Sequence, residues 1–225
     1  MSQIIELSYE LLKQVKHNKE YSTLVARFSK MPFSTITELD TDNKKKTFWI
    51  NIYNAYFLIL RRDEKVPKSK IYKQKLLQIC SKKMSLDDVE HGILRKYRYK
   101  YSLGFITNYF TNAWIKKNAV KELDFRIHFA LNCGAKSCPP IAFYSLEKLD
   151  YQLKMATGVF IEQETRIDEG SKTVHLSRLF LWYKADFGNG KEVNDIIQKH
   201  LQKDIIDYRI KYSEYNWEED LSNFA

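Results

Sequence analysis

The sequence predicts an α+β fold, a mostly helical single domain with a small β-sheet. Apolar residues recur with helical spacing toward both ends of the chain, whereas strand-like alternation is confined to the middle and the last third. Strands and helices do not alternate regularly, which argues against a parallel βαβ series. With 225 residues, 44% of them hydrophobic, the chain is long enough to bury one sizeable core.

The first part of the chain, residues 1–44, is expected to be a helical segment that packs on a domain formed by residues 45–225. Its apolar residues cluster by turn and predict helices over 2–16 and 19–30. It lacks the basic start and the uninterrupted apolar run of a secretory signal. Thr47 is expected to cap the next helix. The last turn of that helix carries two cations, Arg61 and Arg62.

The other elements are predicted from caps and from alternation. Ser85 and Asp88 resemble a capping box and predict a helix through residue 97. The segment RIHFALNC, residues 126–133, has the clearest strand pattern in the chain. The remaining predicted elements are helices over 105–118, 146–160, 179–186 and 192–201, and strands over 173–177 and 208–212.

Composition limits the class of protein. The net charge of +9 comes from dispersed basic residues, and although RKYRYK (95–100) interleaves cations with tyrosines, no nucleic-acid module accompanies it. The longest apolar segment, FWINIYNAYFLIL, is too short to cross a bilayer. Three cysteines, an odd number, in a chain without an export signal predict reduced thiols and a cytoplasmic location. We therefore expect neither a membrane nor a nucleic acid as partner.

Two amides lie in the apolar helix predicted over 47–62. Asn51 and Asn54 are spaced i, i+3, so both side chains point the same way. A buried amide costs on the order of 1–3 kcal/mol unless it is hydrogen-bonded. Either these amides tie the helix to a neighbouring loop, or one of them orients a catalytic group or contacts substrate.

Glu90 and His91 lie at the edge of an apolar stripe in the segment SLDDVEHGILRKY. A carboxylate beside a core needs a cation or hydrogen-bond donors, since burial alone would raise its pKa. Structural pairing explains such a glutamate, but the pattern also places an acid and an imidazole side by side.

Alternation in the predicted strand puts Arg126 and His128 on one face and Cys133 on the other, with the core side chains. Cys138 follows in a turn before two prolines, so only this thiol is a candidate nucleophile, with His128 as its base. Arg126 is then either an anchor for a substrate carboxylate or the ion-pair partner of Glu90.

A metal site is not expected. His128, Cys133 and Cys138, together with His91, could supply four ligands, but their spacing is poor for zinc. Alternation also points Cys133 away from His128. We expect no metal and no other cofactor.

Several motifs taken together resemble the domain of unknown function 547 family. They are FWINIYNA (48–55), VEHGILR (89–95), LDFRIHFALNCGAKSCPPI (123–141), LDYQL (149–153), LFLWYKADF (179–187) and the tail YSEYNWEEDLSN. The chain departs from the family pattern at Phe125 and at Asn216. The residues that match the pattern are Asn51, Tyr53, Asn54, Glu90, His91, Arg95, Arg126, His128, Cys133, Gly134, Ser137, Cys138 and Pro139.

Two functions are consistent with this set. The first is a thiol-dependent hydrolase or acyl-transfer enzyme acting on a peptide-like or amide substrate. Its catalytic residues would be Cys138, His128, Glu90 and His91, backbone N–H groups after Gly134 would bind an oxyanion, and Asn51, Asn54, Arg95 and Arg126 would bind substrate. The second is a non-catalytic ligand-binding or scaffold domain with a buried polar network. In both cases the partner is expected to be an unidentified small molecule or peptide.

Overall fold

The computed structural model describes residues 3–225 and confirms a mostly helical α+β fold. Its central element is α4 (Asp42–Leu58), which continues as the π-helical turn η1 (Ile59–Asp63) and is buried on all sides from Lys45 onward. Helix α1 (Gln3–Lys16) packs against α4 through Ile4, Ile5, Leu11, Leu12 and Val15. The boundary expected after residue 44 falls inside α4. The division into 1–44 and 45–225 stays a prediction.

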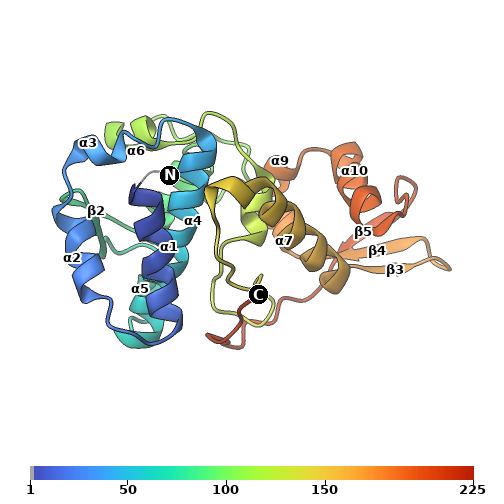
Figure 1. Ribbon diagram of the computed structural model, residues 1–225. Coiled ribbons are helices and arrows are strands. Elements are labelled where there is room, and N and C mark those ends of the chain that lie inside the picture. Colours follow the sequence, from blue (N-terminus) through green and yellow to red (C-terminus); the bar gives the residue numbers. More distant parts are fainter. Residues whose placement is uncertain (1–2) are drawn as a thin grey trace.

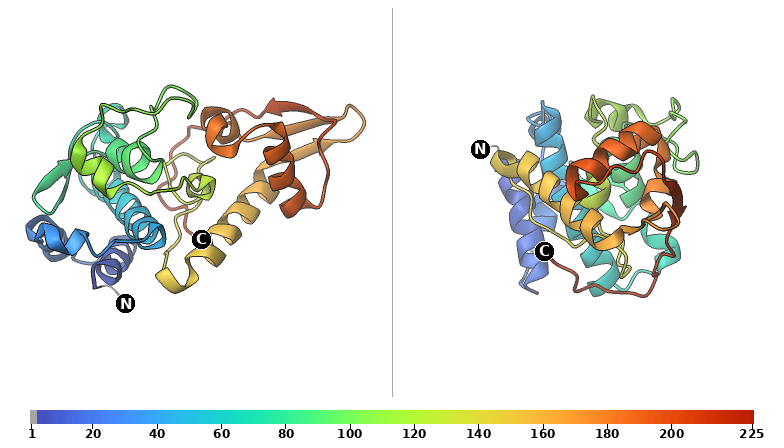
Figure 2. Two further views of the ribbon diagram at one scale, coloured as in Figure 1. Left: turned by 90° about the horizontal axis from the view of Figure 1, so that it is seen from above. Right: turned by 90° about the vertical axis from the view of Figure 1, so that its right-hand side faces the viewer.

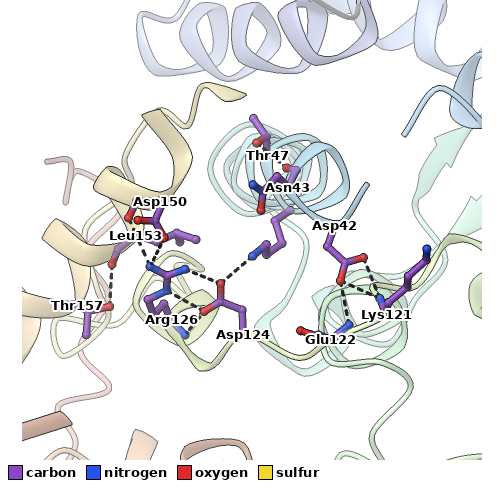
Figure 3. Close-up of polar contacts among 11 residues, drawn as sticks. Asp42, Asn43, Thr47, Lys121, Glu122, Asp124, Arg126, Asp150, Leu153 and Thr157 are labelled. Carbon is purple, nitrogen blue, oxygen red and sulfur yellow. Dashed lines mark hydrogen bonds and ion pairs between the residues drawn. The ribbon is translucent and has the colours of Figure 1, made fainter. Parts of the chain in front are cut away.

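The predicted cap of α4 was wrong. The side chain of Thr41, not Thr47, accepts the backbone N–H of Lys44 and begins the helix. Thr47 lies in the helix interior, where its hydroxyl donates to the carbonyl oxygen of Asn43. Asp42 also accepts the backbone N–H groups of Lys121 and Glu122, which fixes the start of α4 to a distant loop (Figure 3).

The remaining elements lie in two adjoining groups (Figures 1 and 2). Around α1 and α4 lie α2 (Ser22–Lys30), α3 (Phe33–Ile36), α5 (Lys68–Ile71), β1 (Leu77–Ile79), β2 (Lys82–Met84), η2 (Asp88–Leu94) and α6 (Ala113–Asn118). The other group holds η3 (Phe125–Phe129), η4 (Leu146–Lys148), α7 (Leu149–Glu164), β3 (Arg166–Asp168), β4 (Thr173–Leu176), α8 (Leu179–Trp182), α9 (Lys184–Phe187), α10 (Gly190–Leu201) and β5 (Arg209–Tyr212).

Two small sheets accompany the helices. Strands β1 and β2 form an antiparallel hairpin that the sequence did not predict. In the second sheet β4 lies between β3, to which it is antiparallel, and β5, to which it is parallel. The strands predicted over 173–177 and 208–212 are thus confirmed, as are the helices predicted over 146–160 and 192–201.

The strand predicted over 126–133 does not form. Its first residues form the short 3₁₀-helix η3, because the Asp124 side chain caps it by accepting the backbone N–H of Arg126. Ile127 and Ala130 belong to the core around α4, whereas Phe129 belongs to the second core around α7 and α10. The segment lies between two cores and is apolar for that reason, so its alternation did not indicate two faces of a strand.

The helix predicted over 105–118 is also mostly wrong, since only α6 is helical and the residues before it form a loop. The capping box is confirmed: Ser85 and Asp88 exchange side-chain and backbone hydrogen bonds of 2.9 and 3.0 Å. The element that follows is the π-helix η2, which carries Glu90 and His91 of the candidate site. Within residues 3–225 we find no helix of the length and apolar character that a membrane crossing demands.

Candidate functional site

A cavity of about 190 Å³ lies where the two cores meet. Four predicted site residues, Glu90, His91, His128 and Cys138, line it together. The structure therefore brings together side chains from η2, η3 and the turn after it. The other lining residues are Tyr53, Tyr72, Asp87, Lys100, Leu131, Cys133, Pro139, Leu179, Trp182, Tyr183, Tyr215 and Trp217.

Glu90 is buried and held on both oxygens. The Tyr183 hydroxyl donates to Oε1 at 2.7 Å, and the Tyr53 hydroxyl donates to Oε2 at 3.3 Å. Burial raises the pKa of this carboxyl, but His91, the Tyr183 hydrogen bond and Arg95 outweigh burial and leave the pKa below its usual value. Glu90 is therefore a carboxylate that positions two tyrosines.

His91 accepts a hydrogen bond from Arg95. Nη1 of Arg95 lies 2.8 Å from Nδ1 of His91, and because a guanidinium can only donate, Nδ1 carries the lone pair. Burial, with Arg95 adding to it, lowers the pKa of His91 although Glu90 opposes the shift. With this nitrogen occupied, His91 is poorly suited to act as a base.

Arg95, predicted to bind substrate, has a side chain with no solvent exposure. Its Nε donates to Oδ2 of Asp186 at 2.5 Å, and its guanidinium lies 4.6 Å from the centroid of the Tyr183 ring. Arg95 is thus a buried cation against Tyr183, neutralised by a carboxylate from α9.

The same Asp186 oxygen lies 2.9 Å from Nε2 of His128. A carboxylate accepts, so Nε2 carries the proton and the neutral ring keeps its lone pair on Nδ1. The Tyr183 ring stacks on the imidazole, with 3.8 Å between centroids. Burial lowers the pKa of His128 despite Asp186, which leaves the imidazole neutral and oriented. This Asp186–His128 pair is the arrangement of a positioned general base.

The two site cysteines form a disulfide, which contradicts the prediction of reduced thiols. The turn after Gly134, which has a φ of 73°, brings the Cα atoms of Cys133 and Cys138 to 6.0 Å, within the usual range for a disulfide. Cys133, expected with the core side chains, is partly exposed, and Cys138 is only 5% exposed. Cys80 is the free cysteine of residues 3–225.

The sulfur of Cys138 has two hydrogen-bond donors. The backbone N–H of Cys133 lies 2.8 Å from it. The Tyr215 hydroxyl lies 3.2 Å from it and also 3.2 Å from the sulfur of Cys133. Tyr215 belongs to a segment that runs beside the disulfide turn, where the side chain of Asn223 donates to the carbonyl oxygen of Cys138 and Ser137 N–H donates to the carbonyl oxygen of Asn216. Residues distant in sequence therefore hold the turn in place.

Asn51 and Asn54 lie outside the cavity, so their prediction as substrate-binding residues is not supported. Asn51 exchanges two hydrogen bonds with the backbone of Tyr144, at 2.8 and 3.1 Å. Asn54 donates to the carbonyl oxygen of Ala130 and accepts the N–H of Asn132. Both amides are fully used in tying α4 to loops, because a buried helix needs such partners for the irregular chain beside it.

Arg126 also lies away from the cavity. It makes a two-pronged ion pair with Asp124 and a third contact, of 2.8 Å, with Asp150 at the start of α7 (Figure 3). Asp124 accepts Lys46 as well, and these two cations hold its pKa at about 2 although burial opposes them. Neither expected role of Arg126, substrate anchor or partner of Glu90, matches this position.

Most of the oxyanion donors expected in the turn after Gly134 are already used. The N–H groups of Gly134, Lys136, Ser137 and Cys138 all donate to acceptors within the chain. Among residues 3–225 no group of three or more His, Cys, Asp or Glu side chains is arranged to hold a metal ion.

Sequence reasoning missed Asp186, Tyr183 and Tyr215. The first two lie in the motif LFLWYKADF and the third in the tail motif, both of which carried the family resemblance as aromatic segments. A tyrosine and an aspartate three residues apart in an aromatic helix were the available signal. Nothing in the local sequence indicates that they contact residues 90 and 128.

Comparison with known proteins identifies the class. Residues 36–161, more than half of the chain, match the family model described as protein of unknown function, DUF547, and the chain belongs to this family. The matched region includes Glu90, His91, His128 and Cys138, but it ends before Asp186. No curated protein and no solved structure matches the chain.

Proposed function

We propose that this protein is a thiol-dependent hydrolase or acyl-transfer enzyme acting on a peptide-like or amide substrate. One observation carries the proposal: the sulfur of Cys138, with two hydrogen-bond donors, borders the same cavity as the Asp186–His128 pair. Cys138 is the nucleophile and His128 is the base, and both roles require that an external thiol reductant first cleave the Cys133–Cys138 disulfide by thiol–disulfide exchange, the reductant being oxidised to its own disulfide.

The donors around Cys138 favour a thiolate after reduction. Hydrogen bonds from the Cys133 N–H and the Tyr215 hydroxyl stabilise the charged sulfur and lower the pKa of a thiol. The lone pair on Nδ1 of His128 accepts the thiol proton, while Asp186 holds the ring by Nε2. Cys138 is thereby deprotonated without exposure to bulk water.

The reaction then follows the order of acyl transfer. The Cys138 thiolate adds to the substrate carbonyl, and the Tyr215 hydroxyl beside the sulfur donates to the oxygen that gains negative charge. The amine leaves with the proton held by His128, and Cys138 becomes a thioester. Water or another acceptor, deprotonated by His128, attacks the thioester and releases the sulfur. Glu90 acts only through Tyr183, which it fixes against the imidazole.

The thiols themselves give the sharpest test. With a reductant, iodoacetamide at mildly acidic pH should label Cys138 much faster than Cys80, whose pKa is raised by burial. Cys133→Ala should make the same labelling independent of reductant, because Cys138 then has no disulfide partner. His128→Gln should slow it. Equal, slow labelling of Cys80 and Cys138 in reduced protein would contradict a nucleophilic Cys138.

Activity is measured on the same variants. A panel of p-nitrophenyl esters and p-nitroanilides should be hydrolysed by the reduced protein and by Cys133→Ala, and Cys138→Ala should abolish turnover. Cys80→Ala is the matched control, since Cys80 is not among the residues that line the cavity and its loss should leave the rate unchanged. Turnover that survives Cys138→Ala would reject the proposed nucleophile.

A non-catalytic ligand-binding domain is the second candidate. Two observations support it. Both oxygens of Glu90 already accept hydrogen bonds from tyrosines of the chain, and Cys138 is already bonded to Cys133, so neither residue has a free group for a reaction. In that case Cys138→Ser leaves ligand binding unchanged, and thermal stabilisation by a small molecule or peptide appears without any turnover. The cytoplasmic location stays a prediction, and the disulfide removes the reduced-thiol argument for it.

A further inference from the structure

A second, larger groove joins the cavity. It has a volume of about 510 Å³ and shares five residues with the cavity, so the two form one continuous surface depression. We name it the apolar groove. Its lining residues are His91, Lys100, Tyr101, Leu103, Trp182, Tyr183 and Trp217.

The apolar groove has no unpaired charge to offer a ligand. The Lys100 ammonium lies 2.8 Å from both oxygens of Asp87, and His91 accepts Arg95 at Nδ1. The rest of the lining is aromatic or aliphatic, and Trp217 and Tyr101 are 61% and 66% exposed. Large apolar side chains that are exposed to water beside a cleft mark a binding surface, because covering them with an apolar group lowers the free energy.

The wall of this groove is fixed to the catalytic pair. The carbonyl oxygen of Leu103 accepts the N–H of Ala185 at 2.9 Å, one residue before Asp186. Gly104, with a φ of 88°, lies so close to Asp186 that a Cβ on it would be 2.4 Å from Oδ1. Leu103 is therefore tied to the segment that carries Asp186, and through Asp186 to His128. A substrate group held by Leu103 is positioned with respect to the base.

The cavity is too small to hold a whole substrate. Its volume of about 190 Å³ is below the roughly 300–1,000 Å³ of pockets that enclose drug-sized ligands. It fits the reacting carbonyl and a short neighbouring group, and the remainder of the molecule must continue along a surface. The apolar groove is continuous with the cavity on the side of Trp182 and Trp217.

We propose that the apolar groove is the substrate subsite that receives the apolar chain, aliphatic or aromatic, attached to the reacting carbonyl. The inference rests on the proposed function and specifies its substrate class: an amide or thioester-forming acyl donor with a hydrophobic acyl group or side chain. Trp217 and Leu103 are the specificity residues. Both are apolar lining residues that lie partly in solvent, and neither belongs to the hydrogen-bonded group around Glu90 and His128.

Binding is measured first, on protein that cannot react. Cys138→Ala should bind hexanamide at least about tenfold more tightly than acetamide in titration calorimetry, because the longer chain buries more methylene groups. Trp217→Ser and Leu103→Ser in this background should each remove most of that preference. The matched control is Phe110→Ser. Phe110 is a fully exposed aromatic residue in the same loop as Leu103 and does not line the groove, so this variant should keep the preference.

Turnover is measured second, with p-nitrophenyl acetate and hexanoate on reduced protein that retains Cys138. Higher kcat/KM for hexanoate, lost in Trp217→Ser and kept in Phe110→Ser, supports both the subsite and the enzyme. Selective hexanamide binding without Cys138-dependent turnover keeps the subsite and rejects the enzyme. Cys138-dependent turnover without a chain-length preference, or a preference that Trp217→Ser and Leu103→Ser leave intact, rejects the subsite. No preference in binding and no turnover reject both.

Discussion

Asp186 and His128 are 58 residues apart in the sequence and are joined by a hydrogen bond of 2.9 Å between Oδ2 and Nε2. Neither side chain is more than 1% exposed. The same carboxylate neutralises the buried guanidinium of Arg95. Asp186 of α9 therefore fixes the tautomer of His128 on η3 and also balances the charge of Arg95, which follows η2.

Asp186→Asn should strongly destabilise the protein, because it leaves the buried Arg95 without a counter-charge. Removal of one partner of a buried pair costs on the order of 3–5 kcal/mol. The free energy of unfolding from urea denaturation is the measurement. The control is Asp150→Asn: that carboxylate is 82% exposed, and loss of its ion pair with Arg126 should cost about 0–1 kcal/mol. Equal costs for the two variants would contradict the role given to Asp186.

Stability should fall as the pH falls. Burial lowers the pKa of His91 and His128 below the ordinary value of 6.5, so below about pH 6.5 the unfolded chain binds protons that the folded protein resists. The pKa values of Glu90 and Asp186 are lowered as well, since their cationic and hydrogen-bond partners outweigh burial. Their contribution to stability is present above the ordinary carboxyl range and is lost at lower pH. All four groups therefore act in the same direction.

Thermal melts between about pH 4 and pH 8 would measure this fall. His128→Gln should flatten the upper part of the profile, near the ordinary histidine pKa, while the exposed His17→Gln should leave it unchanged. A melting temperature that stays constant across this range, or that rises on acidification, would contradict the directions given for these groups.

Asn51→Leu and Asn54→Leu should each destabilise the fold by on the order of 1–3 kcal/mol, because each strands a buried backbone donor and acceptor. Chemical denaturation measures the loss. Asn43→Leu, on the exposed side of α4, is the control and should have little effect. Reduced ligand binding with unchanged stability would instead return these amides to the site.

Arg126→Lys should lower stability by about 1 kcal/mol without changing ligand binding, since lysine keeps the charge but not the fork that grips Asp124. Melting temperatures with and without hexanamide separate the two effects. An equal loss in both conditions is expected. A loss of binding at normal melting temperature would show that Arg126 reaches substrate.

Gly104→Ala should destabilise the protein by more than about 1 kcal/mol, because φ is positive at this position and the new Cβ would be 2.4 Å from Asp186. Gly190→Ala is the matched control, since no atom lies within 4 Å of its Cβ position. The imidazole resonances of His128 should shift in the first variant and not in the second. Unchanged resonances and stability in Gly104→Ala would show that the loop does not press on the pair.

The sequence predicted the class of fold and most helices, because caps and periodicity are local properties. The capping box of Ser85 and Asp88 was such a case. The segment 126–133 could not be predicted in this way, since its apolar residues serve two different cores. Its alternation described neither burial nor backbone conformation correctly, since His128, expected on the polar face, is buried and Cys133, expected with the core, is partly exposed.

Within the site, chemistry was easier to predict than contacts. Glu90, His91, His128 and Cys138 were expected together and line one cavity. Asn51, Asn54 and Arg126 have equally polar side chains, but each is used up by a nearby backbone or carboxylate that only the folded chain reveals. Asp186 was missed because its partners lie 58 and 91 residues away.

The segment from Tyr215 to Asn223 beside the disulfide turn has a consequence during translation. A nascent chain that has emerged only as far as residue 200 already contains both site cysteines and His128, but it lacks Tyr215 and the Asn223 side chain that binds Cys138. Contacts of such long sequence separation are slow to form, because the intervening chain must first be closed into a loop. For that interval the last segment does not yet cover Cys133 and Cys138, so oxidants and reductants reach the two sulfurs more readily than in the folded protein, in which Cys138 is only 5% exposed.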